Sequence, residues 1–108
     1  MDRGKFCYLF RLAFDSSDSI EAFVCAHSDI ATPAQLRKIY SASKLSVDGL
    51  MCSAGYFTNI SLCKDLNLHR NTPVKWKREH FIPYHMRLLI VMAYDITKIK
   101  LTSGESET

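Results

Sequence analysis

Cationic side chains gather in one short segment of this chain. The segment 64–80 holds five of them against two acids, namely Lys64, Arg70, Lys75, Lys77 and Arg78 against Asp65 and Glu79. It therefore carries a charge of +3 by itself, which equals the formal net charge of all 108 residues. A local basic patch on a nearly neutral body is typical of a surface that contacts phosphates. The alternative is a solvated helix face without a partner.

Some of these side chains could also distinguish nucleic-acid bases. An arginine such as Arg70 can pair with O6 and N7 of guanine, and an asparagine such as Asn71 can pair with N6 and N7 of adenine. If they belong to one helix with Lys75, we expect these three residues to face base edges. Lys77 and Arg78 would then face phosphates.

Two short helices joined by a tight turn are predicted for residues 58–79, to position these side chains. Their inner face is supplied by Leu62, Leu66, Leu68, either Val74 or Pro73, and Trp76. Thr58 is a suitable N-cap for the first helix, and with Asn59 it could offer backbone N–H groups to a phosphate. Asn67 occupies the sharp turn, since asparagine tolerates the left-handed conformation well.

The start of the second helix has two alternatives. His69 could begin it, but Pro73 would then lack the N–H that the helix needs at that point. If Thr72 begins it, Pro73 occupies the first helical position and fits well. The second helix is then short, and Arg70 and Asn71 precede it.

The pattern Thr58-x-x-x-Leu62-Cys63-x-x-Leu66-Asn67-Leu68-x-x-x-Thr72-x-x-Lys75-Trp76 resembles the helix-turn-helix of Cro/repressor-like phage regulators. Ile82-Pro83 and the leucine-rich helix after it extend the resemblance, which covers roughly residues 58–96. Asn67 replaces the usual turn glycine, and Pro73 replaces the usual valine. The resemblance implies a sequence-specific DNA-binding transcriptional regulator of phage or mobile-element type.

Catalytic and cofactor motifs are missing from the sequence. It contains no glycine-rich phosphate loop, no H-E-x-x-H and no G-x-S-x-G, so we expect neither an enzyme nor a cofactor. The cysteines, which are Cys7, Cys25, Cys52 and Cys63, include no C-x-x-C pair, and no histidine completes a ligand pattern with them. We expect no metal site, and we expect the cysteines to be reduced and buried.

Helical patterns predominate along the whole chain and predict an all-α domain of six or seven short helices over residues 1–96. Residues 6–14 could form a strand, but their leucine and alanine content favours a helix. Further helices are predicted at 19–27, capped by Asp18 or Ser19, at 33–43, at 46–55, and from Pro83 to about Ile96. Residues 97–108 are expected to form a polar tail without fixed structure.

The last predicted helix is apolar on every side between Leu88 and Tyr94. Such a helix must be covered all round, either by the N-terminal helices or by a second subunit. We therefore expect a homodimer whose interface includes Leu89, Ile90, Val91 and Tyr94. The apolar run is too short to span a bilayer, and no signal peptide is visible, so a soluble cytoplasmic protein is expected.

A different class of function is also compatible with the sequence. The chain could be a small protein-binding inhibitor or antirepressor that uses the helices at 58–79 as a scaffold. Phe57, Phe81 and Tyr84 would supply an aromatic surface for such a partner. The N-terminal half would serve either as support or as a partner-binding surface.

Overall fold

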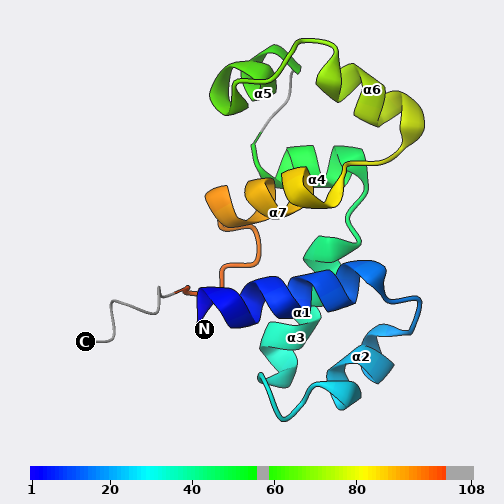
Figure 1. Ribbon diagram of the computed structural model, residues 1–108, viewed down its shortest axis with the longest axis vertical. Helices are drawn as coiled ribbons and strands as arrows, with labels where there is room; N and C mark the ends of the chain where they lie inside the picture. Colours follow the sequence, from blue (N-terminus) through cyan, green and yellow to red (C-terminus); the bar gives the residue numbers. More distant parts are fainter. Residues whose placement is uncertain (56–58, 102–108) are drawn as a thin grey trace. The chain divides into compact units, whose positions relative to one another are not determined.

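A computed structural model describes residues 1–55 and 59–101, without the side chains of 59–61. Helices are its only regular elements over these residues, which confirms the all-α prediction (Figure 1). They are α1 (Arg3–Asp15), α2 (Ile20–Ala26), α3 (Pro33–Ser43), α4 (Val47–Ser53), α5 (Asn59–Leu66), α6 (Thr72–Glu79) and α7 (Tyr84–Ala93). The chain divides into an N-terminal unit, Met1–Lys44 with the described part of Thr97–Thr108, and a central unit, Leu45–Ile96.

The N-terminal unit is built on α3, which packs against both α1 and α2. Helices α2 and α3 begin where the sequence predicts caps, whereas α1 begins at Arg3, before the predicted residue 6. Ser19 accepts a hydrogen bond from the backbone N–H of Ala22, and Thr32 and Gln35 form a reciprocal capping box. The core contains Phe6, Leu9, Phe10, Leu36 and Ile39, all fully buried. Residues 6–14 are therefore helical, as their leucine and alanine content indicated.

The chain beyond α7 differs from the expected unstructured tail. Thr97 and Ile99 are buried, and the amino group of Met1 donates a hydrogen bond to the Lys100 carbonyl over 2.7 Å. The prediction was therefore wrong for residues 97–101. Ile99, an isoleucine in a mostly polar stretch, is 6% exposed, and its burial favours the ordered conformation of this segment. Residues 102–108 lie outside the described part of the chain.

The central unit contains α4, α5, α6 and α7. Helix α4 packs against α6 and α7, and α5 packs against α6. Ser46 caps α4 by accepting from the backbone N–H of Gly49 over 3.0 Å, as predicted. Gly55 follows α4 with φ +86°, a left-handed conformation that glycine adopts without a Cβ penalty. The next two helices, α5 and α6, lie within residues 58–79, where the sequence predicts two helices.

Two further expectations are corrected. Helix α7 ends at Ala93, earlier than expected, and Asp95 beyond it has a positive φ of 49°, which cannot continue an α-helix. The cysteines are not uniformly buried, because Cys25 and Cys52 are exposed. Each follows two consecutive buried residues of its short helix, so the next position turns towards solvent.

Candidate nucleic-acid interface

The turn between α5 and α6 is held by a series of local hydrogen bonds. Asn67 has φ +54°, the left-handed conformation that the sequence predicts there. The backbone N–H of Leu68 donates to the Cys63 carbonyl over 2.9 Å, which closes the end of α5. His69 then organises the second half of the turn. Its Nδ1 accepts from the Asn71 N–H at 3.1 Å, and its carbonyl accepts from the Thr72 N–H at 2.9 Å.

Helix α6 begins at Thr72, which decides between the two predicted starts. In an α-helix begun at His69, the N–H of residue 73 would bond to the His69 carbonyl, and proline has no N–H to give. The Thr72 N–H takes that carbonyl instead. Pro73 is the second helical residue rather than the first. The N-cap of α6 is Asn71, whose side chain makes no capping hydrogen bond. Arg70 and Asn71 therefore lie in the turn, before the helix.

The inner face of α6 is formed by two residues. Pro73 is fully buried and Trp76 is 3% exposed, so the predicted tryptophan anchor is confirmed. Of the two alternatives for the preceding inner position, Pro73 is correct. Val74 is 48% exposed, because it lies about 100° further round the helix. On the α5 side, Leu62 is fully buried.

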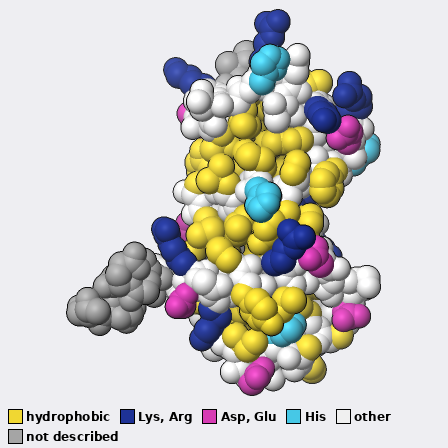
Figure 2. All heavy atoms as spheres, viewed as in Figure 1, with side chains coloured by type: hydrophobic (Ala, Val, Ile, Leu, Met, Phe, Trp, Pro, Cys, Tyr) yellow, Lys and Arg dark blue, Asp and Glu magenta, His cyan; other side chains and the backbone are white. Residues whose placement is uncertain are grey.

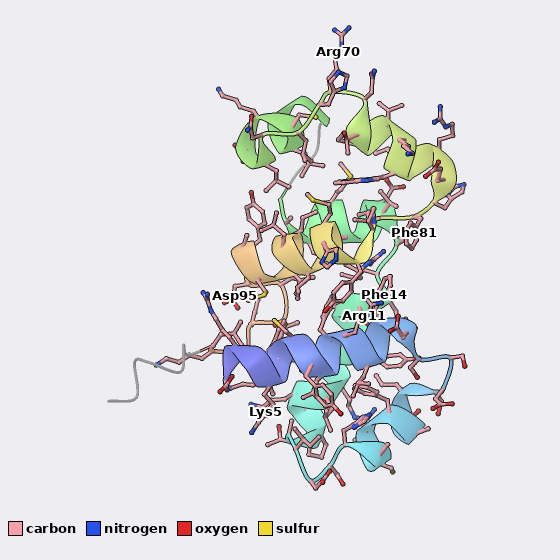
Figure 3. The ribbon with its side chains drawn as sticks, in the orientation of Figure 1. Lys5, Arg11, Phe14, Arg70, Phe81 and Asp95 are labelled. Atoms are coloured by element: carbon pink, nitrogen blue, oxygen red, sulfur yellow. The ribbon has the colours of Figure 1, made fainter. Side chains whose placement is uncertain are left out.

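The predicted cations of this unit all lie on its surface. Arg70, Lys75, Lys77 and Arg78 are exposed, and within the described residues none of their side chains forms an ion pair or a hydrogen bond. Figure 3 shows Arg70 pointing away from the unit at the tip of the turn. In Figure 2, Lys and Arg side chains surround the end of the unit that carries α5 and α6. Unpaired exposed cations are available to an anionic partner.

The cations of α6 lie on two sides of the helix. Lys75 and Arg78 fall on the side opposite Pro73 and Trp76, because helical positions advance by about 100° per residue. Lys77 lies nearer α4, beside a shallow hollow lined by Ser46, Val47, Asp48, Lys77 and His80. The structure therefore has Arg70 and Asn71 in the turn and Lys75 and Arg78 on the outer face of α6. Lys77 lies to one side of that face.

Some predicted residues cannot be placed. Thr58 and Phe57 lie outside the described residues, and Asn59 begins α5 without a described side chain. The predicted capping by Thr58 and the phosphate contacts of Thr58 and Asn59 stay predictions. Among the aromatic residues considered for a protein partner, Phe81 is 47% exposed and Tyr84 is half-buried.

The residues predicted for a dimer interface differ in exposure. Ile90 and Val91 are buried within the single chain, at 0% and 1% exposure. Leu89 is 47% exposed, and Tyr94 is half-buried. Of these four side chains, Leu89 is therefore the one best available to a second subunit.

Arg87 is a structural residue that the sequence analysis missed. It lies on α7 immediately before the apolar run that starts at Leu88, is 5% exposed, and donates from a guanidinium nitrogen to the Leu45 carbonyl over 2.6 Å. Burial lowers the pKa of Arg87 below its usual value, because the charged form loses solvation. The spacing could have indicated this burial. Arg87 is three and four residues before Ile90 and Val91, and therefore lies on the same side of the helix as these two apolar residues.

The remaining chemistry of the chain is limited. No group of three or more His, Cys, Asp or Glu side chains that could hold a metal occurs in residues 1–55 and 59–101. Over the same residues, no helix is both long enough and apolar enough to cross a bilayer. In comparisons with known proteins, no family model, curated protein or solved structure matches the chain.

Proposed function

We propose that this protein is a sequence-specific DNA-binding regulator, and that the central unit contacts the duplex through α6 and the turn before it. Arg70, Asn71 and Lys75 would approach base edges in the major groove, and Lys77 and Arg78 would contact phosphates. The protein would act as a transcriptional regulator of phage or mobile-element type. The proposal includes no catalytic step and no cofactor.

The observation that carries this proposal is the set of exposed, unpaired cations on one end of a small unit. An unpaired cation on α6 loses no intramolecular ion pair when it meets a phosphate, so the interaction with DNA is not offset by a broken contact. The buried pair Pro73 and Trp76 supports the same view. It fixes which side of α6 is presented outward.

The order of the elements also favours DNA over a general anionic surface. Two consecutive helices that pack on each other, joined through a left-handed asparagine, are compatible with the resemblance of residues 58–96 to Cro/repressor-like regulators. In such a unit the residues at the start of the second helix come nearest the base edges. Here Arg70 and Asn71 lie in the turn immediately before those residues, and their side chains have base-pairing geometry.

Selection of bound sequences from a pool of random duplexes tests the proposal. We expect a defined consensus to be enriched, and binding to weaken steeply with salt. Each phosphate contact contributes about −0.9 to the slope of log K against log salt. Contacts by Lys77 and Arg78 alone predict a slope of about −2, and contacts by all five cations predict about −4.5. Absence of any enriched sequence, together with no binding to bulk duplex at low salt, would refute the proposal.

A homodimer is part of the proposed binding mode. Two copies reading half-sites one helical turn apart would double the contact surface. The half-exposed Leu89 on α7 supports this arrangement. It precedes the buried Ile90 and Val91 and offers an apolar side chain to a second subunit. A two-fold symmetric consensus in the selection experiment would be the expected result.

The second candidate function is a small inhibitor or antirepressor that binds a protein. The observation in its favour is Phe81, which is 47% exposed in the segment between α6 and α7 (Figure 3). Exposed aromatic side chains are enriched at protein interfaces. This candidate predicts no enriched duplex, so the selection experiment distinguishes the two functions.

A further inference from the structure

Val74 is an apolar side chain on a face that is otherwise cationic. It is 48% exposed, whereas the proline before it is fully buried. On the helix, Val74 and Arg78 are four residues apart and therefore neighbours, and Lys75 lies about 100° from Val74. Around the outer face of α6, the isopropyl group of Val74 thus lies beside Arg78, and Lys75 lies on the far side of Arg78.

The position of Val74 within the helix is equally informative. It is the third residue of α6, immediately after the turn that holds Arg70 and Asn71. The first turn of a recognition helix is the part that comes nearest to base edges. Valine has poorer helix propensity than alanine, lysine or glutamine, and about half of this side chain stays exposed in the single chain, open to a partner.

We infer that Val74 is a specificity residue that contacts the C5-methyl group of a thymine in the bound DNA. The major-groove edge of an A·T pair carries one apolar group, the thymine methyl, and apolar side chains contact it there. Arg70 and Asn71 can each read a purine by hydrogen bonding through the polar ends of their side chains, whereas the side chain of Val74 is apolar throughout and can contact this methyl. The inference rests on the proposed function, which it deepens by naming a base that α6 selects.

Replacing thymine by uracil removes this methyl alone and leaves Watson–Crick pairing and the sugar–phosphate chain unchanged. In the duplex selected from the random pool, each thymine would be replaced singly by deoxyuridine, and the affinity would be measured at fixed salt. For the wild-type protein we expect one position per half-site where the replacement weakens binding about fourfold, the effect of burying one methyl-sized group. The other positions should change little.

Variants at two neighbouring positions on one side of α6 make the experiment specific. Val74→Ala should bind the thymine duplex about fourfold more weakly than wild type and should no longer distinguish thymine from uracil at that position. Val74→Ile keeps an apolar side chain and should retain the discrimination. Arg78→Ala is the matched control, since loss of a phosphate contact should weaken binding to both duplexes equally.

The outcomes separate this inference from the proposed function. Tight binding of the selected duplex with no sensitivity to any thymine methyl would overturn the role of Val74 and leave the DNA-binding function standing. The role of Val74 would also be overturned if Val74→Ala kept the wild-type discrimination between thymine and uracil, or if the consensus contained no fixed A·T pair. In both cases the DNA-binding function would stand. Failure to bind any duplex would overturn both.

Discussion

Replacing Trp76 by alanine tests the packing that orients α6. Trp76 is 3% exposed, and an aromatic side chain of this size buries about 150–250 Å². At about 25 cal/mol per Å² this burial is worth about 4–6 kcal/mol. Because an unfolded chain already buries part of this area, the value decreases to about 3–5 kcal/mol, the range found for large aromatic residues replaced by alanine.

Thermal unfolding followed by circular dichroism measures the effect. In a domain of about 60–100 residues, 1 kcal/mol shifts Tm by about 4–8 °C, so Trp76→Ala should lower Tm by more than about 10 °C. Val74→Ala is the matched control two positions earlier. Its side chain is half-exposed and alanine is the better helix former, so its stability should change by less than about 0.5 kcal/mol.

The contrast between these two variants is decisive for the orientation of α6. If Trp76→Ala melted like the wild type, Trp76 would not be packed in the core. If Val74→Ala instead caused the large loss, the helix would be rotated by about 160° from the described arrangement, and the outward set of side chains would be a different one.

The remaining predictions address the other features of the central unit. Arg70→Ala and Lys75→Ala should each weaken specific DNA binding by about 1–3 kcal/mol in a titration at fixed salt, with unchanged melting curves; unchanged affinity for both would remove them from the interface. Leu89→Asp should dissociate a dimer and weaken DNA binding together, as measured by sedimentation at micromolar concentration and by titration; a monomeric wild type that binds tightly as one copy per site would contradict the dimer. Arg87→Ala should lower the free energy of unfolding by at least about 1.5 kcal/mol, because it removes a charged hydrogen bond to the Leu45 carbonyl; an unchanged urea midpoint would show that this bond contributes little.

Local sequence features predict most of the helices correctly. Ser19, Thr32 and Ser46 cap helices at the expected residues, because a side-chain oxygen two or three positions before an N–H satisfies it without any tertiary contact. Asn67 adopts the expected left-handed conformation for an equally local reason. Such features depend on neighbours in the sequence, so they can be recognised without knowing the fold.

Features that depend on distant neighbours were harder to predict. Arg87 comes just before the apolar run Leu88–Tyr94, and only the fold shows that its guanidinium reaches the carbonyl of Leu45. Ile99 lies in a mostly polar stretch, and its burial becomes visible only in the folded chain. The predicted burial of Cys25 and Cys52 failed similarly, since cysteine is compatible with either side of a helix and its neighbours decide which side faces out.

Pro73 shows how one residue can change which side chains a helix presents outward. By lacking an N–H, it moves the start of α6 to Thr72 and leaves Arg70 and Asn71 in the turn. It also takes the inner position next to Trp76, which turns Val74 outward beside Arg78. A valine at position 73 could have donated the N–H that a helix begun at His69 requires. Arg70 and Asn71 would then lie on one helix with Lys75.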